Sequence, residues 1–327
     1  MLDYVGMEEQ PPKRQDLRAQ LDRLGYGSGK AKPRVVSVSD LRRAVRKPIQ
    51  KPSAASGAAA TPEPVHYGRD IPRAQPRRRK KSPVAESEVV LEDALTGTEA
   101  CHPERGRFYL LTTAVDTVES GASLNQRFPA MLADAESGLC ERVARTIDPS
   151  GVRIQDIVFM DIETTGLSSS PLFLIGIMVW GTDGFEVHQY FARNYAEEAA
   201  VIATFLDRCC SAKMLVTFNG KTYDYPYIRN RAAANGIPFA LDLAHVDLLH
   251  ESRRIWKHKL PDCKLQTLEA HICGRHRVDD LPGSEIPDAY HAYVRTANAW
   301  QMVGALEHNM FDLITLADIM THFTPLK

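Results

Sequence analysis

The chain has 327 residues, of which 44% are hydrophobic, and a formal net charge of −1. Its length exceeds that of one average domain, and it contains no run of eighteen apolar residues, which excludes a membrane-spanning helix. The N-terminus has no apolar segment behind a basic start, so we predict no secretory signal. Six scattered cysteines indicate reduced thiols. We therefore expect a soluble cytoplasmic protein with no membrane partner.

The first 85 residues differ in composition from the rest of the chain. They hold 19 Lys and Arg against 8 Asp and Glu, whereas residues 86–327 hold 21 basic and 33 acidic side chains. They also hold 10 of the 20 prolines, and such a segment buries too little apolar surface to offset the entropy of ordering. We predict a disordered basic arm over 1–85. Its run of Arg and Lys at 77–81 suits either phosphate contacts or a solvated tail.

Residues 86–150 are predicted to form a small appended segment. Apolar runs alternate with Gly and Pro turns over 86–115, which indicates two or three short strands as a small β element. A helical pattern that ends in a loop follows over 123–150.

The remaining region, 151–327, has a denser pattern of elements. Strands are expected at 157–161, 172–181, 185–192, 213–220 and 244–250. Helices are expected at 196–210, 224–236, 263–274, 288–297 and 300–323. Three consecutive strands followed by helix, strand, helix, strand and helices predict a layered α/β domain. We expect a five-stranded mixed sheet flanked by helices, with the first, fourth and fifth strands parallel and the second antiparallel.

Four acidic residues stand out in this region. Asp161 and Glu163 end the first apolar strand, and they share one face because strand side chains alternate. Asp224 opens a helix after the fourth strand, and Asp312 lies four residues after His308 on the last helix, hence on the same helical face. Alone, each is ordinary: a solvated strand end, a helix N-cap or a local hydrogen bond. Together they predict a carboxylate cluster that must share cations, and hard oxygen ligands suit Mg²⁺ or Mn²⁺.

These stretches also resemble a known family. "FMDIETTGL", "FNGKTYDYPYI" and "HNMFD" resemble the three motifs of the DEDD 3'–5' exonuclease superfamily. Residues 150–323 are similar to the bacterial YprB-like ribonuclease-H-like exonuclease family, through "HVDLLHESRRIW", "CKLQTLE" and "VDDLPGSEIPDAYHAYVRT". The resemblance implies an RNase H-like fold and a site in which two divalent cations are held by Asp161, Glu163, Asp224 and Asp312.

The same resemblance implies roles for the residues around the acids. His308 would orient or deprotonate the attacking water, which suits a side chain whose pKa lies near working pH. Its spacing of four before Asp312 departs from the spacing of five usual in the histidine branch, and matches the tyrosine branch. The turn that would receive the 3'-terminal nucleotide consists of Thr164, Thr165, Gly166 and Leu167.

Three further residues are candidates for substrate contacts. Asn219 ends the fourth strand, and Tyr223 would stack on a base. Lys264 would contact a phosphate, although a solvated surface charge is an equal alternative.

The region is therefore predicted to be a metal-dependent 3'–5' exonuclease. It would hydrolyse phosphodiester bonds of single-stranded DNA or RNA from the 3' end by a two-metal-ion mechanism. Two alternatives stay open: an RNase H-like endonuclease, and a nucleic-acid-binding adaptor that has the fold without turnover. No protein partner is indicated by the sequence.

Overall fold

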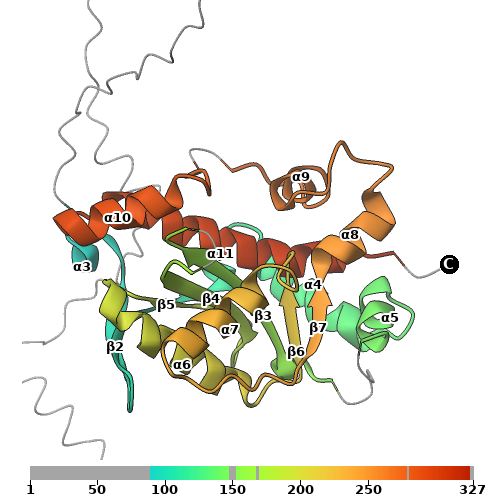
Figure 1. Cartoon of the computed structure of the whole chain (residues 1–327). Helices are drawn as coiled ribbons and strands as arrows, with labels where there is room; N and C mark the ends of the chain where they lie inside the picture. The colour runs from blue at the N-terminus through green and yellow to red at the C-terminus, as the bar shows by residue number, and fades with distance from the viewer. Residues whose placement is uncertain (1–88, 147–151, 167–168, 278–279, 325–327) are drawn as a thin grey trace, which may run out of the picture. The chain divides into compact units, whose positions relative to one another are not determined.

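The computed structural model describes residues 89–146, 152–166, 169–277 and 280–324 (Figure 1). The predicted basic arm lies outside the described residues, as does Leu167. None of the helices within the described ranges has both the length and the apolar character that a membrane crossing requires.

A seven-stranded mixed sheet forms the centre of the fold (Figure 1). Its strands lie in the order β1-β2-β5-β4-β3-β6-β7. β3, β6 and β7 are parallel, and β4 is antiparallel to β3, which confirms the predicted directions of these strands. The strands are β1 (Gly97–His102), β2 (Gly106–Ala114), β3 (Ile157–Thr164), β4 (Leu172–Trp180), β5 (Phe185–Phe191), β6 (Met214–Thr217) and β7 (Ala244–Asp247).

The prediction of five strands is wrong in number. β1 and β2 come from the 86–115 region and extend the same sheet. β2 pairs antiparallel with β5, from Tyr109 opposite Phe191 to Ala114 opposite Glu186, and β1 pairs with β2. The added pair covers an edge of β5 that would otherwise present unpaired N–H and C=O groups. Local alternation indicates a strand but not the edge that it joins, which is why the sequence pattern missed this pairing.

Several predicted elements also have different bounds from those expected, and two of these differences bear on the fold. The strand expected over 244–250 stops at Asp247, whose carboxylate accepts a hydrogen bond from the N–H of Leu249 and caps α8 (Leu248–Trp256). The helical pattern in 123–150 forms two helices, α4 (Gly121–Ala133) and α5 (Gly138–Ala144).

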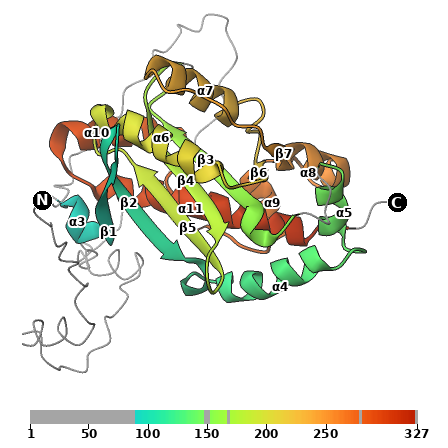
Figure 2. The same ribbon diagram turned by 90° about the horizontal axis from the view of Figure 1, so that it is seen from below.

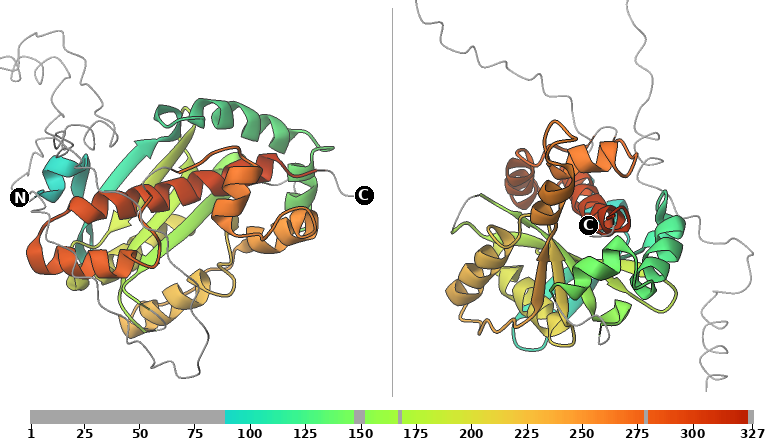
Figure 3. Two further views of the ribbon diagram at one scale, coloured as in Figure 1. Left: turned by 90° about the horizontal axis from the view of Figure 1, so that it is seen from above. Right: turned by 90° about the vertical axis from the view of Figure 1, so that its right-hand side faces the viewer.

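Helices cover both faces of the sheet (Figures 2 and 3). α6 (Glu198–Cys209) and α7 (Asp224–Ala234) pack on one face, and α4 and α11 (Trp300–Thr321) pack on the other. The other helices in the described ranges are α3 (Leu91–Ala94), α9 (Leu265–His271) and α10 (Ile286–Thr296).

The alternation of β3 decides which face carries the acids. Val158, Met160 and Ile162 belong to the core that includes α6, whereas Ile157 and Phe159 belong to the core that includes α4 and the second half of α11. Side chains two residues apart on a strand share a face. The side chains that follow Phe159 on its face, at positions 161 and 163, are therefore directed toward α11.

Candidate active site

β3 ends with the first two acids, both half-buried. Asp161 lies opposite Gly176 of β4 and Glu163 opposite Leu174, and the register shifts directly after Glu163. Burial raises the pKa of both carboxyls well above their usual range. The charges of Asp312 and Asp224 raise both pKa values further, and Asp161 adds to the effect on Glu163. These shared effects place the four acids in one electrostatic cluster.

Asp224 begins α7 after the turn that follows β6, and its side chain is buried. The turn passes close to it: a Cβ on Gly220 would lie 2.8 Å from Oδ2 of Asp224 and 2.4 Å from Oγ1 of Thr217. Glycine is therefore the residue that allows the backbone to approach. Burial, then the charges of Asp247 and Asp312, raise the pKa of Asp224 to about 7.

The turn between β6 and α7 is held by the end of β7. Asp247 accepts hydrogen bonds from the N–H of Asn219 at 2.8 Å and of Lys221 at 3.1 Å. Asn219 itself has a φ of 63°, in the left-handed region that asparagine tolerates better than most residues. The side chain of Asp247 is therefore a structural support for Asp224 rather than a free acid.

Asn309 on α11 ties the helix to β3. Its amide nitrogen donates to the carboxylate Oδ2 of Asp161 at 2.8 Å and to the backbone oxygen of that residue at 3.2 Å. Its amide oxygen accepts from Nε2 of Gln189 at 2.9 Å. Asn309 is fully buried, and a Cβ on Gly176 would lie 2.0 Å from its amide oxygen. The absence of a side chain at Gly176 thus makes room for the residue that orients Asp161.

Asn309→Ala is expected to lower the free energy of unfolding by about 1–3 kcal/mol, because buried hydrogen-bonding groups on Asp161 and Gln189 lose a partner. Urea unfolding at pH 7 measures the change. Lys259→Ala, at an exposed position, serves as the control and should change stability by no more than about 0.5 kcal/mol. Equal stability of the two variants would contradict this role of Asn309.

His308 and Asp312 lie on adjacent turns of α11, with His308 Nε2 3.6 Å from Oδ2 of Asp312. Nδ1 of His308 lies 3.1 and 3.0 Å from the two carboxylate oxygens of Asp280, which precedes α10. Burial disfavours the charged imidazole, but the Asp280 hydrogen bond and the charge of Asp312 outweigh it, so the pKa of His308 is raised. The imidazole is therefore hydrogen-bonded to Asp280 through Nδ1, whereas its Nε2 lies near Asp312 but beyond hydrogen-bond distance.

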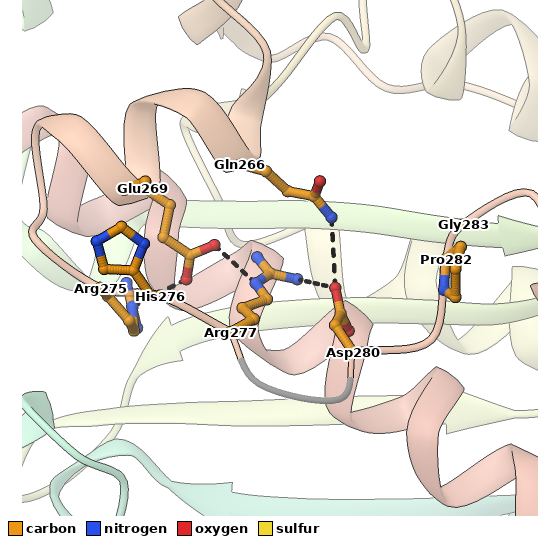
Figure 4. Close-up of a pocket in the computed structure, with 9 residues that line it drawn as sticks. Gln266, Glu269, Arg275, His276, Arg277, Asp280, Pro282 and Gly283 are labelled. Carbon is orange, nitrogen blue, oxygen red and sulfur yellow. Dashed lines mark hydrogen bonds and ion pairs between the residues drawn. The ribbon is translucent and has the colours of Figure 1, made fainter. Parts of the chain in front are cut away.

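Arg277 is a cation that contacts Asp312, and Figure 4 shows its contacts with Glu269 and Asp280. Its guanidinium donates to Oδ1 of Asp312 at 2.5 Å and to Oε2 of Glu269 at 2.6 Å, and lies 3.6 Å from Asp280. Only 8% of its side chain is exposed. Glu269, Arg277 and Asp280 line a cavity of about 540 Å³ between α9 and the segment before α10.

The four acids differ from the tightest set of metal-ligating groups among the described residues. That set is Cys273, Asp318 and His322, whose ligand atoms lie within 4.8 Å of one another. Asp318 already pairs with Arg127 at 2.8 Å and with Arg275 at 3.5 Å, so positive charge is supplied there by the protein.

The acid cluster is a better donor set for divalent cations. Among the four acids, no arginine or lysine counter-charge from the protein is seen at Asp161, Glu163 or Asp224 in the described residues, whereas Arg127 and Arg275 pair with Asp318. Burial and neighbouring carboxylates raise the pKa of Asp161, Glu163 and Asp224, and hard oxygen ligands suit Mg²⁺ or Mn²⁺. The residues that would hold the ions are Asp161, Glu163, Asp224 and Asp312.

Four of the predicted substrate residues lie close together after the end of β3. Thr164, Thr165 and Gly166 form the turn after β3, where the hydroxyls of Thr164 and Thr165 donate to the backbone oxygens of Gly166 and Pro171. Tyr223 lies beside this turn, with its hydroxyl 3.4 Å from that of Thr164.

For the two other candidates, Asn219 and Lys264, the structure shows no side-chain contact with any of the four acids in the described residues. The backbone of Asn219 forms the turn that precedes Asp224. Lys264 precedes α9 and is 81% exposed, and its ammonium group lies 3.8 Å from Asp262, which is not one of the four acids.

Sequence reasoning missed Asn309, Arg277 and Asp280. Asn309 stands within "HNMFD", and its position one residue after His308 was a usable signal, because a buried amide often orients a carboxylate. Arg277 and Asp280 lie in an irregular segment, "RHRVDDLPG", where no periodicity indicates which charges point inward.

Comparison with known protein families identifies the superfamily of this fold. The model of the RNase H superfamily matches residues 158–324, which is half of the chain and contains all four acids. The chain belongs to the RNase H superfamily. The expectation of an RNase H-like fold is thereby confirmed, and the superfamily is one of nucleases that generally use divalent metal ions.

A curated protein and a solved structure are among the proteins that match the chain. It is 31% identical over 194 residues to the uncharacterized protein YprB of Bacillus subtilis (strain 168), covering 58% of this chain and 46% of that protein. The chain thus spans about half the length of this curated relative, and the likeness confirms the expected membership of a YprB-like family within the superfamily. A family B DNA polymerase from the archaeon Pyrobaculum calidifontis matches with a TM-score of 0.42 and 17% identity, over 50% of this chain and 24% of the polymerase.

Proposed function

We propose that the protein is a metal-dependent 3'–5' exonuclease that hydrolyses phosphodiester bonds of single-stranded nucleic acid. The observation that supports it is the convergence of acids from β3, α7 and α11 on one cluster, in which the charge of Asp312 on α11 helps to raise the pKa of Asp161, Glu163 and Asp224. Such a cluster is charged at neutral pH when cations share it. Two Mg²⁺ or Mn²⁺ ions suit these ligands.

The residues of the cluster have separate tasks in this proposal. Asp161, Glu163, Asp224 and Asp312 would hold the ions, which when bound activate the attacking water and stabilise the leaving 3'-oxygen. His308, beside Asp312, accepts the proton that the water releases. Thr164 and Tyr223 receive the 3'-terminal nucleotide, since Tyr223, of which 37% is exposed, lies next to the end of β3 and offers a stacking surface.

A substrate panel tests this function. Linear DNA and RNA strands labelled at the 3' or the 5' end, and closed circles of both, are incubated with the protein and Mn²⁺. We expect 3'-labelled strands to lose their label as mononucleotides first, 5'-labelled strands to shorten progressively, and circles to stay intact, because an exonuclease needs a free end.

Two other outcomes of the panel would replace the proposal. Cleavage of the circles would indicate an endonuclease on the same fold. Binding of the linear strands without cleavage, together with no heat of Mn²⁺ binding by calorimetry, would indicate an adaptor.

A further inference from the structure

Asp280 is not one of the four proposed metal ligands, yet its carboxylate contacts His308. Both of its carboxylate oxygens lie within hydrogen-bond distance of Nδ1, at 3.1 and 3.0 Å. The two residues are 28 positions apart in sequence, so the contact is made by the tertiary fold rather than by one helix. The side chains are largely buried, with 17% of Asp280 and 10% of His308 exposed.

This contact determines which nitrogen of the imidazole carries the proton. An ionised carboxylate only accepts hydrogen bonds, so Nδ1 must be the donor. In the neutral ring the lone pair then lies on Nε2. That nitrogen faces the acid cluster, 3.6 Å from Oδ2 of Asp312, and a Cβ on Gly283 at the cavity wall would lie 4.0 Å from it.

We propose that Asp280 is a positioning residue for the nuclease reaction: it holds His308 as the Nδ1-protonated tautomer and leaves Nε2 free to accept the proton of the attacking water. The proposal rests on the proposed nuclease function. It also explains how a histidine spaced four residues before Asp312 performs the role, since the ring is oriented by a carboxylate from another part of the chain and not by its helical position alone.

Among the described residues Asp280 also contacts two other side chains, and the test must separate these contacts from the one with His308. Its Oδ2 accepts from Nε2 of Gln266 at 3.3 Å and lies 3.6 Å from Arg277 (Figure 4). If Asp280 acted only by supporting Arg277 or the segment around it, its removal would harm the protein whether or not His308 is present.

A double-mutant cycle makes that separation. Asp280→Leu, which keeps the branching and number of side-chain heavy atoms and removes the acceptors, is expected to lower kcat about 10- to 100-fold with KM within about twofold. In a His308→Gln background the same substitution should change kcat by less than about twofold, because the group through which Asp280 acts is gone. Gln266→Leu, which removes only the neighbouring contact of Asp280, should leave kcat within about twofold. An equal loss in both backgrounds would overturn the proposal.

A second measurement is independent of activity. Protein labelled with ¹⁵N-histidine, in EDTA and at a pH where the ring is neutral, reports the tautomer of each imidazole, and His308→Gln identifies the resonances of His308. We expect a protonated Nδ1 in the wild type and a shift toward the Nε2-protonated form in Asp280→Leu. Unchanged ring-nitrogen resonances in that variant would overturn the proposal. If the wild type cleaves no strand in the panel, the proposed function fails, and this spectrum alone still decides the tautomer.

Discussion

Asp224→Asn is expected to abolish metal-dependent cleavage and, in the absence of metal, to make the folded protein more stable at pH 8. Removing one carboxylate ligand of the two proposed metal ions should lower kcat by at least about 1,000-fold. Activation of water by a metal and stabilisation of the developing charge supply most of the rate enhancement in such a reaction. The two effects have opposite signs for one physical reason: the buried charge that would bind the ions is unfavourable without them.

The sign of the stability effect follows from the pKa of Asp224. Its folded-state pKa is raised from the ordinary 3.8 to about 7, first by burial and then by Asp247 and Asp312. A raised carboxyl pKa contributes stability below pH 3.8 that is lost as the pH rises through about 7. At pH 8 the wild type carries this cost and the neutral asparagine does not, so the variant should gain roughly 1–3 kcal/mol.

Urea unfolding in EDTA at pH 8 and at pH 4 measures this prediction, because the gain should shrink at pH 4, where the aspartate is protonated. Adding Mn²⁺ should stabilise the wild type and not the variant. Asp242→Asn, at an exposed position, is the matched control and should show neither effect. A variant that is less stable than the wild type at pH 8, or that cleaves at more than a tenth of its rate, would contradict the assignment of Asp224.

The second large effect is expected at Arg277. Arg277→Met should lower the free energy of unfolding in EDTA by about 3–5 kcal/mol, since removing one partner of a buried ion pair leaves an uncompensated charge. The guanidinium contacts Asp312 at 2.5 Å and Glu269 at 2.6 Å, and the side chain of Glu269 is 2% exposed. Burial already raises the pKa of Glu269 despite its two arginine neighbours, so that carboxylate depends on them.

Chemical unfolding at pH 7 gives the measurement. Arg254→Met, which removes an exposed arginine paired with Glu251, is the control and should cost less than about 1 kcal/mol. Replacing both partners, as Arg277→Met with Glu269→Met, should recover part of the loss, because the buried Glu269 charge, which keeps only Arg275 as a partner in the single variant, is then removed. If Arg277→Met costs no more than the control, the guanidinium is not the counter-charge of this site.

The candidate site divides into residues that local sequence patterns reveal and residues that they do not. Asp161 and Glu163 were predictable because they interrupt a buried strand at its end with period-2 spacing. Asp224 and Asp312 were predictable because each stands at a defined place on a helix. The resemblance of the three motifs then joined them. Asp280 and Arg277 have no such local signal, since they lie in an irregular segment whose inward direction is set by α11 and α9.

The sheet divides in the same way. The directions of β3, β4, β6 and β7 followed from the order of strands and helices, because a helix between two strands favours a parallel crossover. The pairing of β2 with β5 did not, because both partners have ordinary alternation and any free edge would accept them.

By itself, therefore, the sequence determined the layered α/β architecture and the superfamily to which the chain belongs, and it indicated the four acids that we propose as metal ligands. Tertiary structure alone decided that the sheet has seven strands, that Asn309 and Gly176 together orient Asp161, and that His308 is held between Asp280 and Asp312. The physical reason is the separation in sequence between the residues that interact. Backbone periodicity is set by neighbouring residues, whereas the partner of a buried charge is set by which distant segments the fold brings within a hydrogen-bond length.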